Sequence, residues 1–310
     1  MLKIKFNQDL FDKHISKIFN KIIPKLSKKK ILSYKLNADE INCLKYVGDN
    51  LKDILSSNVS KLKGYMFYFQ LKYPNSLGIE GQKKENWNPL YKILRDDIFE
   101  NEYNNWGGRT VEYNAYEFVS TLDLKTCPYC NRNYTFIVDE KSGKLRPEID
   151  HFYPKSKYPF LAMSFYNLIP SCPICNHTKS NKDRLDLINP YNVKENDFKF
   201  SIIPNNIDFF NVENKKYNFN SFELELNGNK SNIEVFKLEE LYKQHKDIVL
   251  DILIKKAYYP KSYVEELQRF GFGSDEIYRY LFSNYKKDED LHKRPLSKLI
   301  KDISKELNLI

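Results

Sequence analysis

Two cysteine pairs constrain the fold of this chain more than any other feature of its sequence. Cys127 and Cys130 lie in "CPYC", Cys172 and Cys175 lie in "CPIC", and 42 positions separate Cys130 from Cys172. In a reducing compartment, thiols at this spacing are typical metal ligands. Four thiolates complete a tetrahedral site, so we expect one structural Zn²⁺ ion with the intervening chain looped out. A redox role for one pair is the alternative, and the presence of two proline-bearing pairs disfavours it.

The composition is that of a globular protein. Hydrophobic residues make up 41% and charged residues 29% of the 310 positions, which is typical of a chain with a packed core. Five cysteines are too few for a disulfide scaffold, and Cys43 is best interpreted as a small buried residue. No apolar run approaches the roughly 18–20 residues of a membrane helix, and the first residues do not resemble a signal peptide. We therefore expect a cytoplasmic protein without a membrane partner.

Positive charge is concentrated at the N-terminus. The formal net charge is +9, and residues 1–35 contain ten lysines against Asp9 and Asp12, a local net charge of +8. A basic segment of this kind suits a polyanion, because lysines that neutralise phosphates release bound counterions. A solvated lysine-rich face is the alternative, so the charge supports nucleic-acid binding without establishing it.

Hydrophobic periodicity predicts helices in residues 1–120. The apolar residues of 8–23 fall on one helical face, and Pro24 ends the run. Residues 38–55 repeat the pattern. Residues 121–190 change character: we expect strands at 134–138 and 148–150, a turn at 139–144, and a helix from about Pro173 to Ile188.

The region 191–310 predicts a strand and then mostly helices. Residues 222–226, "FELEL", alternate with a period of two and precede Asn227-Gly228, which predicts a hairpin turn. Helical patterns follow at 238–256, 274–285 and 295–307. His14 and His245 lie on or beside apolar helical stripes and are expected to be packed, whereas His292 lies in a charged turn.

Three segments near the cysteine pairs occur in a fixed register: "EIDHFYPKS" (148–156), "YNLIPSCPICN" (166–176) and "HTKSNK" (177–182). This register resembles the HNH nucleases of the ββα-metal (His-Me finger) superfamily. Their pattern has Asp-His at a strand end, an Asn-Leu strand, and Cys-x-x-Cys followed by His or Asn and a lysine three positions on. Here 17 positions separate Asp150 from Asn167, and 9 separate Asn167 from Asn176. The resemblance extends from Cys127 to about Ile188.

The resemblance implies an α+β fold. A central ββα-metal finger with a four-cysteine zinc site (121–190) would be flanked by a helical, basic N-terminal region (1–120) and a mixed, mostly helical C-terminal region (191–310).

The resemblance also implies a catalytic site. His151 would act as a general base on water, because its ordinary pKa lies near neutral pH. Asp150 and the amide oxygen of Asn176 would hold Mg²⁺ or Mn²⁺, hard cations that prefer oxygen ligands. Asn167 would orient the His151 ring. Neighbouring strand residues point to opposite sides, so Asp150 and His151 can serve the metal and the base separately.

The residues after Asn176 suit contacts with nucleic acid. On a continuing helix, Lys179 and Ser180 share the face of Asn176 and can reach the same phosphate. His177 lies about 100° around the helix, beside Arg184, and is either a nucleic-acid contact or a surface residue. The predicted set of contacts is Lys179, Ser180, His177, Lys182 and Arg184.

Two features depart from the family's pattern. The position of Asn176 is commonly His, although some relatives also have Asn there, which implies at most a changed metal preference. The loop after Ser156 usually contains glycines, whereas this chain has "KYPFLAMSFY", which predicts a stiffer and more apolar loop.

The predicted function is a metal-dependent HNH endonuclease that cuts DNA. The chain is similar to stand-alone HNH nucleases of bacterial anti-phage systems such as the Septu type, in which an ATPase is the partner. This chain has no GxxxxGK[ST] motif, so ATP dependence would have to come from another chain. A non-catalytic zinc-stabilised nucleic-acid-binding module and an RNA-cleaving or toxin nuclease with the same chemistry are the alternatives.

Overall fold

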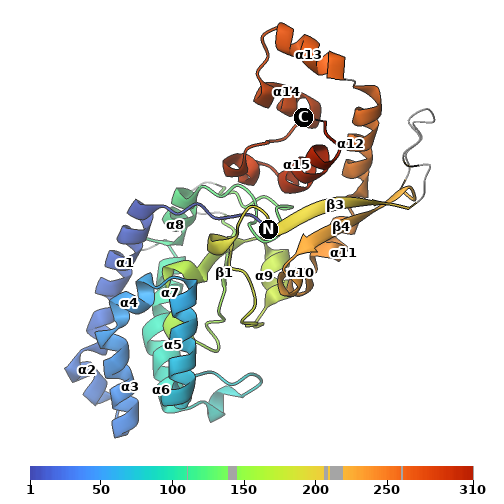
Figure 1. Cartoon of the computed structure of the whole chain (residues 1–310). Helices are drawn as coiled ribbons and strands as arrows, with labels where there is room; N and C mark the ends of the chain where they lie inside the picture. The colour runs from blue at the N-terminus through green and yellow to red at the C-terminus, as the bar shows by residue number, and fades with distance from the viewer. Residues whose placement is uncertain (110, 139–144, 206–208, 210–218, 260, 310) are drawn as a thin grey trace. The chain divides into compact units, whose positions relative to one another are not determined.

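The computed structural model describes the chain except residues 110, 139–144, 206–208, 210–218, 260 and 310 (Figure 1). The described residues form a mixed structure in which helices predominate and the strands form two small antiparallel sheets. Two compact units are present, each assembled from segments distant in sequence. The N-terminal unit contains Lys5–Asp123 and Phe136–Leu185, and the C-terminal unit contains Met1–Ile4, Leu124–Thr135 and Asp186–Ile310. The sequence, by contrast, predicts three consecutive regions.

The first 120 residues are helical, as predicted. Their elements are α1 (Gln8–Ile22), η1 (Ile23–Leu26), α2 (Lys28–Ser33), α3 (Ala38–Asp49), α4 (Leu51–Ser56), α5 (Val59–Lys72), η2 (Pro74–Ser76), η3 (Lys84–Asn86), α6 (Pro89–Lys92), the π-helical η4 (Ile93–Phe99), α7 (Glu100–Gly107) and α8 (Ala115–Leu122). Figure 1 shows α1, α3 and α5 lying alongside one another. The helix predicted over 38–55 is divided into α3 and α4, because the backbone of Asn50 leaves the helical conformation.

Two strands and a short helix follow within the same unit. β1 (Glu148–His151) pairs antiparallel with β2 (Leu168–Ser171), and Cys172 then caps α9 (Pro173–Lys179). The 3₁₀ turns η5 (Pro159–Leu161) and η6 (Phe165–Asn167) lie between the two strands. Pro173 begins the helix because its fixed φ suits the first helical position and its missing N–H is not needed there.

The helix predicted from Pro173 to Ile188 is much shorter in the structure. It ends at Lys179, because Ser180 has φ of 49°, a conformation incompatible with a continuing helix. Lys182 and Arg184 therefore lie in the following loop, and the predicted placement of His177 beside Arg184 on one helix is wrong.

The C-terminal unit contains a second hairpin and a series of helices. β3 (Phe198–Pro204) pairs antiparallel with β4 (Phe222–Gly228). The remaining elements are η7 (Pro190–Asn192), α10 (Lys230–Val235), α11 (Leu238–Lys243), α12 (Lys246–Tyr258), α13 (Lys261–Arg269), α14 (Ser274–Phe282), η9 (Asp288–Lys293) and α15 (Ser297–Glu306). The helix predicted over 238–256 is divided into α11 and α12, whereas α14 and α15 lie within the predicted ranges.

Two strand predictions differ from the structure. Asn227 and Gly228 end β4 instead of forming a hairpin turn, because β4 pairs with the earlier strand β3 and Asn229 then caps α10. Residues 134–138 form only isolated bridges, at Tyr134 and Val138, instead of a strand. The turn predicted at 139–144 lies outside the described residues. Within the described part of the chain, no helix has the length and apolar character needed to span a bilayer.

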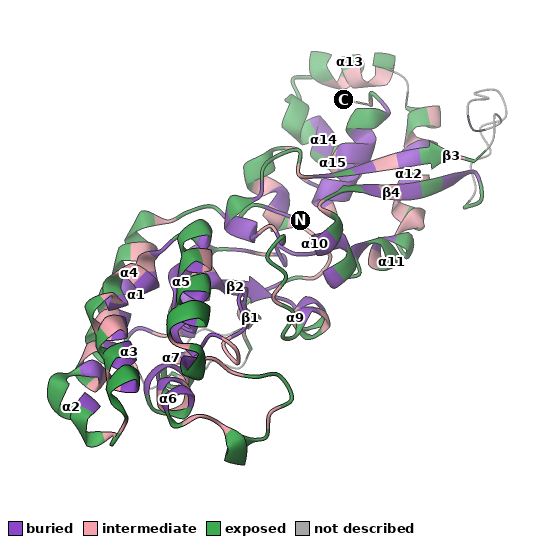
Figure 2. Cartoon of the chain, turned by 60° about the horizontal axis from the view of Figure 1, so that its bottom comes forward, coloured by how far each residue is buried: buried purple, intermediate pink, exposed green. Residues whose placement is uncertain are grey.

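Part of the basic N-terminal segment is neutralised within the fold. Lys13, Lys17 and Lys25 form ion pairs with Glu117, Glu112 and Glu102, respectively. Lys28–Lys30 instead lie on α2, most of which is exposed (Figure 2). The charge available to a polyanion is therefore smaller than the composition suggests.

His14 is packed in the core, as predicted. Its side chain is fully buried, its Nδ1 lies 2.9 Å from the Tyr113 hydroxyl, and its Nε2 donates to the carbonyl of Met163 at 2.8 Å. Burial lowers the pKa of His14 to about 4. The imidazole is therefore neutral in the folded protein and connects α1 to the segment between β1 and β2.

We expect His14 to make the fold acid-sensitive. Because the pKa of His14 is lower in the folded state than in the unfolded state, the unfolded chain binds the extra proton, and stability falls as the pH drops from about 6.5 to 4. The shift corresponds to about 3 kcal/mol. Chemical denaturation of the wild type and of His14→Gln across this pH range measures the difference. Parallel pH dependences for the two proteins would contradict the expectation.

Candidate functional site

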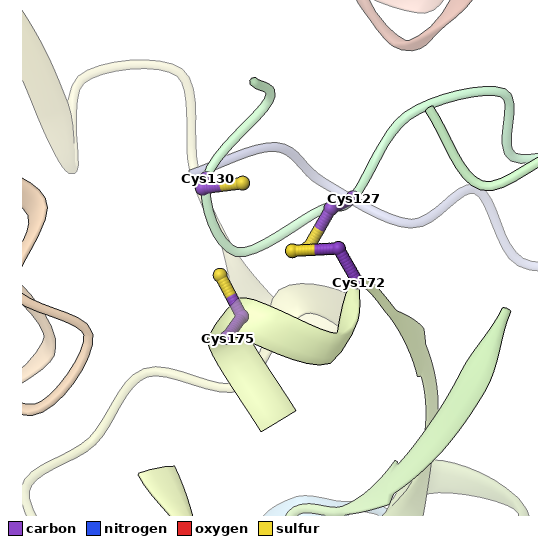
Figure 3. Close-up of side chains that lie close together, drawn as sticks. All are labelled: Cys127, Cys130, Cys172 and Cys175. Carbon is purple, nitrogen blue, oxygen red and sulfur yellow. The ribbon is translucent and has the colours of Figure 1, made fainter. Parts of the chain in front are cut away.

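The four cysteines predicted to bind zinc lie together. Their sulfur atoms are all within 4.8 Å of one another, and all four residues are buried. Figure 3 shows the Cys127–Cys130 turn and the start of α9 directing these sulfurs toward a common centre. Zinc–sulfur bonds of about 2.3 Å place tetrahedral sulfurs about 3.8 Å apart, so the donor set fits zinc. The cluster can bind a metal ion such as zinc, as predicted.

Backbone groups stabilise the cysteine turns. The N–H of Asn131 donates to the Cys127 carbonyl at 2.7 Å, and the N–H of Arg132 donates to the sulfur of Cys130 at 3.4 Å. The N–H of Asn176 donates to the Cys172 carbonyl at 3.1 Å. The two bonds to carbonyl groups hold the turns that carry the sulfurs, and the bond from Arg132 offsets negative charge on the Cys130 thiolate.

His151 ends β1 in a single tautomer. Its Nε2 lies 3.0 Å from the carbonyl oxygen of Ala162 and must carry the proton, which leaves Nδ1 as the acceptor. Nδ1 has no hydrogen-bond partner among the described residues and is not among their fully buried unpartnered atoms. Solvent therefore reaches this nitrogen, although the residue as a whole is only 8% exposed.

The imidazole of His151 is neutral at physiological pH. Burial and then the positive charge of Lys155 lower its pKa to about 3, with a smaller contribution from Lys179. The hydrogen bond to the Ala162 carbonyl acts in the opposite direction. The lone pair of a neutral imidazole can accept a proton. A pKa this far below neutral, however, makes the free site a weaker base than the ordinary imidazole that the sequence predicts.

Asp150 lies on the neighbouring position of β1 and is paired with Lys179. The ammonium of Lys179 lies 3.0 Å from Oδ1 of Asp150 and donates to the backbone carbonyl of His151 at 2.7 Å. Both side chains are almost fully buried, with exposures of 4% and 1%. Lys179 is thus directed at β1, and its contact with a phosphate stays a prediction.

Asn176 lies one helical turn before Lys179 and contacts β1 two residues before Asp150. Its Nδ2 donates to Oε2 of Glu148 at 2.7 Å, and Nε2 of His177 lies 3.4 Å from the other oxygen of the same carboxylate. Residues 148 and 150 point to the same side of a strand. Carboxylate and amide oxygens, the ligand types that Mg²⁺ and Mn²⁺ prefer, thus come from β1 and α9, but Oδ1 of Asp150 is bonded to the Lys179 ammonium. The binding of a catalytic ion by Asp150 and Asn176 stays a prediction.

Asn167 holds the loop that precedes it. Its amide nitrogen donates to the carbonyls of Tyr153 and Leu161, at 3.0 and 2.9 Å, and its amide oxygen accepts from the N–H of Tyr153 at 2.7 Å. Leu161 directly precedes Ala162, the residue that accepts from His151. Any effect of Asn167 on the His151 ring therefore passes through the backbone of this loop.

The other predicted nucleic-acid contacts lie at the end of α9 or beyond it. His177, Ser180, Lys182 and Arg184 are exposed. Lys182 donates to the Thr178 carbonyl at 2.9 Å. Their contact with nucleic acid stays a prediction.

The sequence reasoning missed several residues around this site. Glu148 is one of them, although its position two before Asp150 places it on the same face of the strand. Tyr103 and Glu100, from α7, approach the segment after His151. No sequence signal identifies them, because they lie about 50 residues before it in the chain.

Part of the chain is similar to a curated protein, the Septu protein PtuB of Bacillus thuringiensis. The two are 31% identical over 99 residues, which cover 31% of this chain and 35% of the relative. The chain thus matches about a third of the relative's length. No family model matches the chain, and no solved structure matches it.

We expect one zinc ion per chain, and Cys175→Ser to abolish stoichiometric binding because three thiolates leave the tetrahedral site incomplete. Elemental analysis after gel filtration measures the metal content. Cys43→Ala is the matched control, since burial raises the pKa of the Cys43 thiol to about 12 and keeps it protonated. Full zinc occupancy in Cys175→Ser would rule out the four-cysteine site.

Removing the partner of Asp150 should destabilise the fold. Lys179→Met leaves a buried carboxylate without a counter-charge, which costs about 3–5 kcal/mol of unfolding free energy. The double variant Asp150→Asn, Lys179→Met should recover much of this loss. Urea titration measures both, with Lys182→Met as an exposed-lysine control expected to change stability by less than about 0.5 kcal/mol. Equal effects of the two lysine variants would contradict the assigned role of the buried pair.

Proposed function

We propose that this chain is a metal-dependent HNH endonuclease that hydrolyses phosphodiester bonds in DNA and acts in the bacterial cytoplasm in anti-phage defence. The observation that carries the proposal is the geometry of His151: its Nε2–H bond to Ala162 directs Nδ1 away from that contact, and carboxylate and amide oxygens of β1 and α9 lie on the neighbouring elements. A binding module has no need of such a proton acceptor.

The local architecture supports the nuclease class. β1 and β2 form an antiparallel pair, α9 follows directly, and Asp150, His151, Asn167 and Asn176 occupy these three elements and their connections. This order supports the assignment to the ββα-metal fingers. The partial similarity to the Septu protein PtuB supports a role in a defence system of that type.

Asp150 and the amide oxygen of Asn176 would hold the catalytic ion, with the carboxylate of Glu148 beside Asn176. A bound Mg²⁺ or Mn²⁺ ion supplies positive charge that polarises the phosphate and stabilises the leaving 3′ oxygen. Asn176 then orients its amide through the bond from Nδ2 to Glu148. Lys179 balances the charge of Asp150 and anchors the strand beneath it.

His151 performs the proton transfer. Nδ1 takes a proton from a water molecule, the resulting hydroxide bonds to phosphorus, and the bond from phosphorus to the 3′ oxygen breaks. The Nε2–H bond to Ala162 keeps the ring oriented and stabilises the imidazolium that forms. Asn167 helps to hold the Ala162 carbonyl in place, because its amide nitrogen donates to the carbonyl of the preceding residue, Leu161.

Exposed polar residues around α9 would contact the nucleic-acid backbone. His177, Ser180, Lys182 and Arg184 are at the surface, where hydroxyl, ammonium and guanidinium groups can bind phosphate oxygens. Lys179 is buried against β1, so it would influence the phosphate indirectly, by holding Asp150 and the strand in position. An ATPase subunit is the partner we propose, by analogy with defence systems of the Septu type. The chain has no GxxxxGK[ST] motif, so any ATP dependence would have to come from that subunit.

The decisive experiment compares wild type with His151→Ala on plasmid DNA, single-stranded DNA and single-stranded RNA, with Mg²⁺ or Mn²⁺. We expect the wild type to cleave DNA and the variant to lose activity by roughly 10²- to 10⁴-fold, with unchanged DNA affinity by fluorescence anisotropy. His292→Ala is the control histidine variant and should cleave normally. DNA binding without any cleavage by the wild type supports a non-catalytic module, and preferential cleavage of an RNA substrate supports the ribonuclease alternative.

A further inference from the structure

A helix outside the strand–strand–helix segment contacts the proposed base. The ring of Tyr103, on α7, lies 4.6 Å from the His151 ring between centroids, at an interplanar angle of 62°. This edge-to-face arrangement is the favoured geometry for a pair of aromatic rings. The Tyr103 hydroxyl lies near the Ile149 carbonyl of β1, at a long 3.4 Å, so the main contact with the strand is made by the ring.

A series of charged side chains, Lys155, Glu100 and Arg95, also contacts the Tyr103 ring, through Lys155. The ammonium of Lys155 lies 4.5 Å from the centroid of the Tyr103 ring and forms an ion pair of 2.6 Å with Glu100. The second oxygen of Glu100 bonds Nε of Arg95 at 2.8 Å. These three charged side chains are 18–27% exposed, and ion pairs shielded in this way are screened less by salt than surface pairs are.

The helical region also fixes the backbone that carries Lys155. The Tyr91 hydroxyl donates to the Ser156 carbonyl at 2.6 Å, and the N–H of Gly78 donates to the Lys157 carbonyl at 3.0 Å. A Cβ atom at Gly78 would lie 1.9 Å from the Ser156 carbonyl oxygen, so the close approach requires glycine.

The series of ion pairs starts at a residue in a π-helix. Arg95 belongs to η4, a π-helical segment of 7 residues that leads directly into α7. π-helical turns are rare and are frequently found at functional sites. Glu100 and Tyr103 are three residues apart on α7 and so lie on the same helical face.

One hydrogen bond does not fix an imidazole ring. The bond from Nε2 of His151 to Ala162 defines one direction but leaves the ring free to turn about that bond, which would move Nδ1. An aromatic ring packed against the imidazole removes this freedom. The segment from η4 to α7 supplies such a ring and a set of ion pairs that hold it.

We propose that Tyr103 is a positioning residue for His151, and that Glu100 and Lys155 hold the Tyr103 ring in place. The role in catalysis rests on the proposed nuclease function, whereas the effect on the imidazole itself does not. Under this proposal, α7, which precedes both cysteine pairs in the sequence, contributes residues to the candidate site.

The test uses full-length Tyr103→Leu and Tyr103→Phe, with Tyr68→Leu on α5 as a matched tyrosine control. Nitrogen-15 NMR of the histidine side chains reports the tautomer of His151, and DNA cleavage kinetics report kcat and KM. We expect Tyr103→Leu to lose the single Nε2–H tautomer and to lower kcat roughly 10- to 100-fold, since small misplacements of a base have effects of this size, with KM within about 2-fold. Tyr103→Phe keeps the ring and should behave like wild type, as should Tyr68→Leu.

An unchanged tautomer and unchanged kcat in Tyr103→Leu would overturn the inference. If that variant does not fold, Glu100→Gln decides the question: mixed tautomers of His151 support the proposal, and a wild-type spectrum contradicts it. Failure of the nuclease function is seen separately, as absence of His151-dependent cleavage by the wild type. The NMR comparison still tests the positioning role in that case.

Discussion

The docking of α9 on β1 through one buried ammonium group is the interaction on which the rest of the site depends. Lys179 bonds both the Asp150 carboxylate and the His151 carbonyl, and its side chain is only 1% exposed. In a medium of low dielectric constant, an unpaired charge at this place would cost several kcal/mol, so the helix and the strand must stay in register. The bond from Asn176 to Glu148, one turn earlier, adds a second contact in the same register.

The loop between β1 and β2 depends on the helices for its shape. His14 donates to the Met163 carbonyl, the Ser164 hydroxyl donates to the Ile54 carbonyl at 2.8 Å, and Gln70 donates to the Tyr158 hydroxyl at 3.2 Å. Buried apolar side chains fill the space between these bonds, among them Phe160, Leu161, Met163 and Phe165. The loop therefore needs no glycines, and the helical region supports the Ala162 carbonyl that orients His151.

Burial and two nearby lysines keep the imidazole of His151 neutral, and each of these lysines is paired with an acid. Lys155 and Lys179 both lower the pKa of the imidazole, so the ring enters the proposed reaction without a proton. The same two lysines each have an acidic partner, Glu100 and Asp150. The site thus combines a neutral imidazole with charges that are balanced locally, so neither lysine offers an unpaired positive charge.

The sequence by itself determined the cysteine cluster, the helical character of the first 120 residues and the strand that carries Asp150 and His151, because spacing and hydrophobic periodicity are local properties. Only the tertiary structure decided where α9 ends, which strand pairs with β4, and that Asn167 bonds backbone carbonyls. The end of α9 depends on the burial of Lys179 against β1, and the contacts of Glu148 and Tyr103 join residues far apart in the chain. Such choices are made by packing and by the desolvation of charged groups, neither of which leaves a pattern in a short stretch of sequence.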